Sequence, residues 1–126
     1  MSYDLALWFP NEILSDEQAL EKYNKLCNDE TSGLTPHPSI GSFYLELYKL
    51  HPEIDDVPEE KLGDFDFSPW SMEHDLSDRH LMLSCVWSHA EYVHDLVLTL
   101  AQKHGLAMFD PQLIKIHYPT HQRNSH

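Results

Sequence analysis

The sequence has few basic residues, few glycines and only two cysteines. Among its 126 residues, 8 lysines and arginines stand against 21 aspartates and glutamates, which gives a formal net charge of −13. Such a charge repels phosphate backbones, so it argues against direct nucleic-acid binding and favours a basic protein partner. The four glycines are not clustered, so the chain has no glycine loop of the kind that holds phosphate groups.

The two cysteines, Cys27 and Cys85, each lack a second cysteine at metal-ligand spacing, so the sequence contains no zinc motif. Each falls at an apolar position of a periodic segment, and we expect both to be buried, reduced thiols rather than a disulfide. Cys85 lies near His89 in the sequence, but a thiol inside an apolar strand is usually inert. We therefore predict no thiol nucleophile.

Long hydrophobic runs are also missing, and none approaches the ~20 residues that cross a bilayer. The opening "MSYDLALWFPNE" lacks a basic segment, and its apolar run from Leu5 to Phe9 is short. We expect no signal peptide, no membrane contact and a cytoplasmic protein. The apolar content of 41% excludes a disordered chain, and the length predicts a single domain, residues 1–126.

Alternating apolar residues predict two central strands, at 3–9 and 80–87. In the first, the alternate residues from Tyr3 to Phe9 are apolar, and Ala6 and Trp8 make the other face apolar too. A strand of this kind is covered on more than one side. In the second, Leu81 and every second residue after it share one face, and the run from 70 to 78 pairs with it as a hairpin.

Helical spacing of apolar residues predicts three helices. Ser15 and Gln18 form a capping box before the helix at 15–29, and Ser88 and Glu91 form another before 88–104. Gly105 is placed to end the last helix. A third set of apolar residues at helical spacing predicts a helix at 39–50, and this helix should end at His51 because the next residue is Pro52.

Together these elements predict an α+β domain of the ferredoxin-like, split βαβ class. Its antiparallel sheet would carry the helices 15–29 and 88–104 on one face, with strands 3–9 and 80–87 at the centre. The helix and the acidic loop within 39–69 would be an insertion, 111–119 would add an edge strand, and 119–126 would be a frayed tail. The predicted strands and helices, in chain order, are 3–9, 15–29, 39–50, 70–78, 80–87, 88–104 and 106–110.

The acidic segment 51–70, "HPEIDDVPEEKLGDFDFSPW", holds seven carboxylates, three prolines and one lysine. Nine of the thirteen net negative charges lie between residues 53 and 78. Phe65 and Phe67 pin the loop to the core, or else one or more of Phe65, Phe67, Trp70 and Trp87 act as interface anchors inside a charged rim. The predicted partner-binding residues are Asp55, Asp56, Glu59, Glu60, Asp64, Asp66, Phe65 and Phe67.

Ten histidines raise the possibility of metal or acid–base chemistry. His89 and His94 are five residues apart on a helix, about 140° around its axis, which is poor geometry for one ion. His74 and His80 flank the hairpin turn, and we interpret them as surface residues while leaving open whether they bind a metal. A proline-broken acidic loop is a weak site for catalytic carboxylates, so we predict no catalytic residue and no cofactor.

Three stretches resemble a group of small, mostly uncharacterised bacterial proteins: "YDLALWF" near the start, "FYLEL" with "HPE" in the middle, and "LAQKHGLAMFDPQ" near the end. Some members of this group act as immunity proteins beside polymorphic toxins, including those of contact-dependent growth inhibition. The resemblance covers much of the chain, but its motifs are structural and transfer no functional residues. It implies a partner that is a cognate toxin.

Resemblance and charge therefore indicate the same function. A toxin that is a nuclease presents a basic surface to phosphates, and an acidic immunity protein can occupy that surface. The alternatives are a small metal- or histidine-dependent hydrolase that uses the hairpin histidines, and a housekeeping domain whose acidity keeps it in solution. The oligomeric state stays open.

Overall fold

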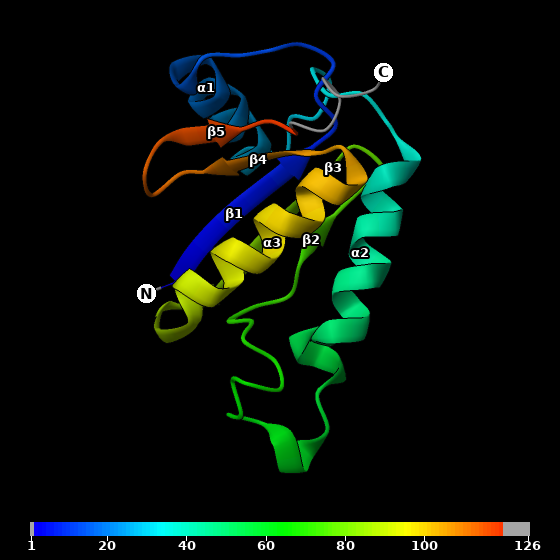
Figure 1. Cartoon of the computed structure of the whole chain (residues 1–126), viewed down its shortest axis with the longest axis vertical. Coiled ribbons are helices and arrows are strands. Elements are labelled where there is room, and N and C mark those ends of the chain that lie inside the picture. The colour runs from blue at the N-terminus through cyan, green and yellow to red at the C-terminus, as the bar shows by residue number, and fades with distance from the viewer. Residues whose placement is uncertain (1, 120–126) are drawn as a thin grey trace.

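A computed structural model describes residues 2–119 of the chain (Figure 1). It is an α+β fold with three α-helices and a five-stranded antiparallel sheet in the order β2-β3-β1-β4-β5. No helix within the described residues is long and apolar enough to cross a membrane. Of the predicted tail, residues 120–126 lie outside the described part. The elements are β1 Ser2–Trp8, α1 Asp16–Cys27, α2 Pro38–Leu50, β2 Asp75–Leu76, β3 His80–Val86, α3 Ala90–His104, β4 Ala107–Asp110 and β5 Lys115–His117.

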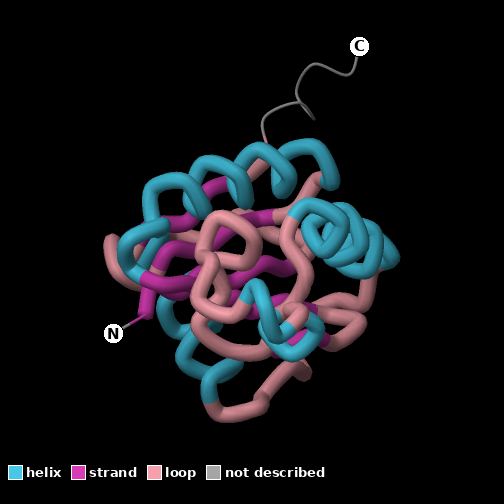
Figure 2. Tube along the Cα trace, turned by 90° about the horizontal axis from the view of Figure 1, so that it is seen from below, coloured by secondary structure: helices cyan, strands magenta, loops and turns pink. Residues whose placement is uncertain are grey.

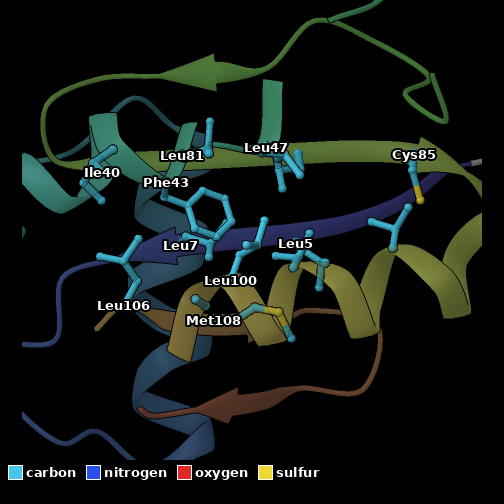
Figure 3. Packing of buried hydrophobic residues seen from close by; sticks show 14 of the residues in the cluster. Leu5, Leu7, Ile40, Phe43, Leu47, Leu81, Cys85, Leu100, Leu106 and Met108 are labelled. Carbon is cyan, nitrogen blue, oxygen red and sulfur yellow. The ribbon is translucent and has the colours of Figure 1, made fainter. Parts of the chain in front are cut away.

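The two strands that hydrophobicity marked as central are adjacent interior strands of the sheet. β1 and β3 pair along their whole length, with Leu5 opposite Leu83 and Leu7 opposite Leu81. These leucines face a core that also receives buried side chains of α2 and α3, among them Phe43 (Figure 3). The predicted edge strand is also present, because β5 pairs with β4 at the rim of the sheet.

The prediction that helices 15–29 and 88–104 share one face of the sheet is wrong. α2 and α3 pack on one face, whereas α1 covers the other through Ala19 and Leu26. There α1 meets a second core built on Trp8 and Phe109. The physical reason is the second apolar face of β1, which needs its own cover (Figure 1).

The helix ends agree with the sequence in three of four cases, and one of them is the end of α2, where His51 is the C-cap as predicted. Ser15 and Gln18 form the predicted capping box of α1, and Gly105 ends α3 with a left-handed φ of 71°. The predicted Ser88–Glu91 box is wrong, because a 3-10 turn over Trp87–His89 shifts the N-cap of α3 to His89. The Ser88 hydroxyl, which the prediction made the helix cap, contacts the ring of His89 instead.

The predicted strand 70–78 is interrupted. Trp70 bridges to Cys85 and Asp75–Leu76 pairs with the start of β3, but the residues between leave the sheet. The cause lies at His74, whose backbone N–H donates to the Glu53 carboxylate at 2.9 Å rather than to β3. Its ring turns inward and packs edge-on against Trp70 at 4.6 Å between centroids.

Only one of the two cysteines is buried as predicted. Cys85 on β3 is 1% exposed, and burial raises the pKa of its thiol to about 12. The prediction for Cys27 is wrong, because its thiol is exposed at the C-terminal end of α1. The preceding residue, Leu26, takes the buried position, so Cys27 points away from that core. Both thiols are free.

Candidate functional site

The acidic loop, residues 51–70, joins α2 to the sheet and forms one end of the molecule (Figures 1 and 2). It contains two 3-10 turns, Ile54–Asp56 and Glu59–Lys61, and no longer regular element, as its prolines predicted. Gly63 has a φ of 87°, a left-handed conformation that glycine adopts without strain.

Hydrogen bonds to buried side chains hold the base of this loop. His51 is 8% exposed, and its two ring nitrogens contact the Phe67 carbonyl at 3.0 Å and the Tyr92 hydroxyl at 2.7 Å. The Trp70 indole N–H donates to the His51 carbonyl, and Ser68 donates to the Pro52 carbonyl at 3.0 Å. These hydrogen bonds join residues 51–52 at the start of the loop to residues 67–70 at its end. The two ends form a fixed stem, and the residues between them form the tip of the loop.

Glu53 ties the loop to both α2 and the interrupted strand. Its carboxylate accepts hydrogen bonds from the Tyr44 hydroxyl and from the backbone N–H of His74. Burial first, and then the bond to Glu53, raise the pKa of Tyr44 above its ordinary value. Glu53 therefore has a structural role, and the charge at the tip comes from its neighbours.

All six predicted carboxylates are exposed, and three of them are held in place. Asp56 accepts from the Tyr48 hydroxyl at 2.9 Å, and Asp66 lies 2.9 Å from Nε2 of His89. Asp64 accepts from the backbone N–H groups of Asp66 and of the residue that follows it. Glu59 and Glu60 have no such contact within the described structure, and Asp55 has only the Glu73 carboxyl beside it.

The carboxylates crowd one another. The charge of Asp55, together with a hydrogen bond to it, raises the pKa of the Glu73 carboxyl above its ordinary value. Lys61 is the one lysine in the segment, and its ammonium lies over the Phe67 ring, 5.7 Å from the centroid. Negative charge at this end is thus only partly compensated, and a bound cation would relieve the repulsion.

The two phenylalanines of the loop have different environments. Phe67 is partly buried beneath Lys61, and its carbonyl is held by His51, so it pins the loop. Phe65 is 39% exposed and lies edge-on to His89, 6.1 Å between centroids. Phe65 is therefore the aromatic side chain of the loop that a partner can reach.

The hairpin histidines are not surface residues, and that interpretation is wrong. His74 is 9% exposed between the rings of Trp70 and Tyr44, and His80 is 5% exposed with Nδ1 at 2.7 Å from the Ser77 hydroxyl. The His74 ring turns inward where the chain between 70 and 75 leaves the sheet, whereas His80 is the first residue of β3 and lies opposite Trp8 of β1. Among the described residues, no three histidine, cysteine or carboxylate side chains converge as metal ligands would.

Sequence reasoning missed the part played by α3 in this region. Tyr92 and His89 reach the loop from the first turns of that helix, and Trp87 lies beside them with 51% of its surface exposed. The signal available was the cluster of aromatic and histidine residues at 87–94, which lies far from the loop in sequence.

Comparison of the chain with protein-family models, with curated proteins and with solved structures gave no match. The function must therefore be inferred from the chain's own residues and from the resemblance in its sequence motifs.

Proposed function

We propose that this protein is not an enzyme but an immunity protein, which binds a basic bacterial toxin through the acidic loop. The observation that carries the proposal is a set of exposed carboxylates displayed on a loop whose base is fixed by buried hydrogen bonds. Because the loop is already ordered, a partner loses little affinity to loop ordering.

The charge of the loop favours a protein partner with a basic surface. Opposite charges steer two proteins together, and such association reaches about 10⁸–10⁹ M⁻¹s⁻¹ at low salt. Rapid capture suits a cytoplasmic protein that must block a toxin before the toxin acts. A nuclease meets the requirement best, because its substrate channel must attract phosphates and would attract these carboxylates equally.

Phe65 would supply the apolar contact within this charged surface. Aromatic anchors provide much of the binding energy of an interface, while the surrounding charges set the rate and the specificity of encounter. We therefore assign the encounter to Asp55, Asp56, Glu59, Glu60, Asp64 and Asp66, anchoring to Phe65, and support of the loop to Phe67.

The ferredoxin-like class is also a proposal. It is supported by the order β4-β1-β3-β2 with antiparallel neighbours, and by the shared face of α2 and α3. In this scheme α2, and not α1, is the first helix of the split βαβ pattern, while α1 and β5 are additions. Deleting the Lys115–His117 strand should then leave a folded chain with near-native circular dichroism.

An inhibition assay tests the immunity function. The toxic domain encoded beside this gene is purified and assayed on nucleic acid with increasing amounts of the protein. We expect its activity to fall to background at one equivalent. Full activity in the presence of a twofold excess would overturn the proposal, as would the lack of any toxin gene nearby.

A further inference from the structure

An apolar hollow of about 340 Å³ opens beside the first turns of α3. Its apolar lining comes from Tyr3 of β1, from Trp87 and Ala90, and from Leu113 of the β4–β5 turn. Trp87 is 51% exposed and Leu113 is 71% exposed, so large apolar surfaces of the described chain face water here. Contiguous surfaces of this kind mark binding sites.

Two polar residues of the hollow, Asp110 and Gln112, form hydrogen bonds to the protein beneath it. Asp110 is fully buried, and its carboxylate accepts from the Tyr3 hydroxyl at 2.9 Å and from Gln112, through both its backbone and its side chain. The Gln112 side chain also bonds to the backbone of Asp4 in both directions. The lining of the hollow is therefore mainly apolar, and the buried Asp110 carboxylate lies directly beneath it.

Charge around the hollow is negative. Glu91 lines its rim, is exposed, and forms no ion pair within the described structure. Asp110 lies beneath the apolar lining, and no lysine or arginine is among the lining residues. His94 also lines the hollow, but Asp95 stands 3.4 Å from its Nδ1. A neutral apolar group would gain nothing from these carboxylates.

We propose that the hollow binds the guanidinium group and methylene stem of an arginine side chain. The face of Trp87, which is held edge-on by Tyr3 at 5.5 Å, stacks on the guanidinium. Leu113 covers the methylenes, and Glu91 pairs with the charge. Guanidinium groups prefer tryptophan faces and carboxylates, and they lose less hydration than ammonium groups do.

The residues just before α3 link the hollow to the acidic loop. His89 follows Trp87 by two residues, and it contacts Asp66 at 2.9 Å and the ring of Phe65. One partner could therefore touch both features. That the arginine belongs to the basic toxin depends on the proposed function, but the arginine site itself does not.

Titration of the whole chain with N-acetyl-arginine amide tests the site, observed by nuclear magnetic resonance. Trp87 provides a specific signal, because Trp8 and Trp70 are only 2% and 1% exposed. N-acetyl-citrulline amide has a similar shape and no charge, and N-acetyl-norleucine amide tests a purely apolar occupant. We expect the arginine amide to shift the Trp87 indole resonance and to bind about fivefold more tightly than the citrulline amide.

Two variants give matched controls. Glu91→Gln should reduce arginine binding toward the citrulline level, whereas Glu17→Gln, an exposed residue of α1 on the other face of the sheet, should change nothing. Equal binding of arginine and citrulline amides, preference for norleucine, or an unshifted Trp87 signal would each overturn the proposal.

The two proposals fail separately. If the protein binds the arginine amide but does not inhibit the toxin, the arginine site is supported and the immunity function is refuted. If the protein inhibits the toxin but does not bind the amide, only the arginine site is refuted.

Discussion

Acid should destabilise this protein through His74. The ring is buried among Trp70, Tyr44 and the stem of the loop, and its Nδ1 has no hydrogen-bond partner among residues 2–119. Burial lowers the pKa of His74 to about 4, although the nearby Glu53 carboxylate acts in the opposite direction. The folded protein therefore holds His74 neutral at pH values where the unfolded chain is protonated.

The pH window follows from the two pKa values of this histidine. In the unfolded chain it has an ordinary pKa near 6.5. The stabilisation is complete above that value and is lost as the pH falls toward 4, because the unfolded state binds the proton more readily. Between pH 8 and pH 5 the free energy of unfolding should fall by about 2 kcal/mol on account of His74.

Urea unfolding of the wild type and of His74→Gln at pH 8, 6 and 5 measures this contribution. Burial and the neighbouring His94 also lower the pKa of His117, so the wild type has a second acid-sensitive group, which the variant retains. The wild type should lose about 2 kcal/mol more than the variant between pH 8 and pH 5. Parallel pH profiles for the two proteins would refute the reasoning.

Three further predictions concern the fold. Cys27 should react with a thiol reagent at once and Cys85 only in denaturant, and equal rates would contradict the burial described. Phe43→Ala should lower the free energy of unfolding by about 3–5 kcal/mol, since Phe43 is fully buried, and a loss below 1 kcal/mol in urea titration would contradict that core. Gly105→Ala should cost about 1 kcal/mol by the same assay because of its left-handed φ, and an unchanged stability would argue against that helix end.

The approximate extents of β1, β3 and the helices could be read from local sequence, but the interruption of the 70–78 strand and the placement of α1 could not. Residues 15–29 have an apolar stripe that predicts a helix, and a stripe does not say which face of a sheet it covers. The deciding signal lay in another element, where Ala6 and Trp8 give β1 a second apolar face. Two apolar faces require cover on both sides, and α1 is the helix that provides it.

For the candidate site, the sequence showed where the exposed carboxylates lie, but not which contacts hold the base of the loop. Exposure of the six carboxylates followed from composition and prolines, which are local properties. The stem depends on contacts between distant residues, such as His51 with Tyr92 and Glu53 with His74. Single-sequence patterns carry no record of such pairs, so the burial of His74 and the contact of Tyr92 with the loop were both missed.

Association kinetics of two charge variants with the toxin test the central claim most directly. One variant carries Asp55→Asn, Glu59→Gln and Glu60→Gln, and the matched control removes three exposed carboxylates beside or on α1: Glu17, Glu21 and Glu30, each to Gln. Beyond ~8 Å charges are largely screened at physiological salt, so position matters more than net charge. We predict association slowed on the order of tenfold, with a weaker salt dependence, for the loop variant alone. Equal rates for both variants would contradict the account.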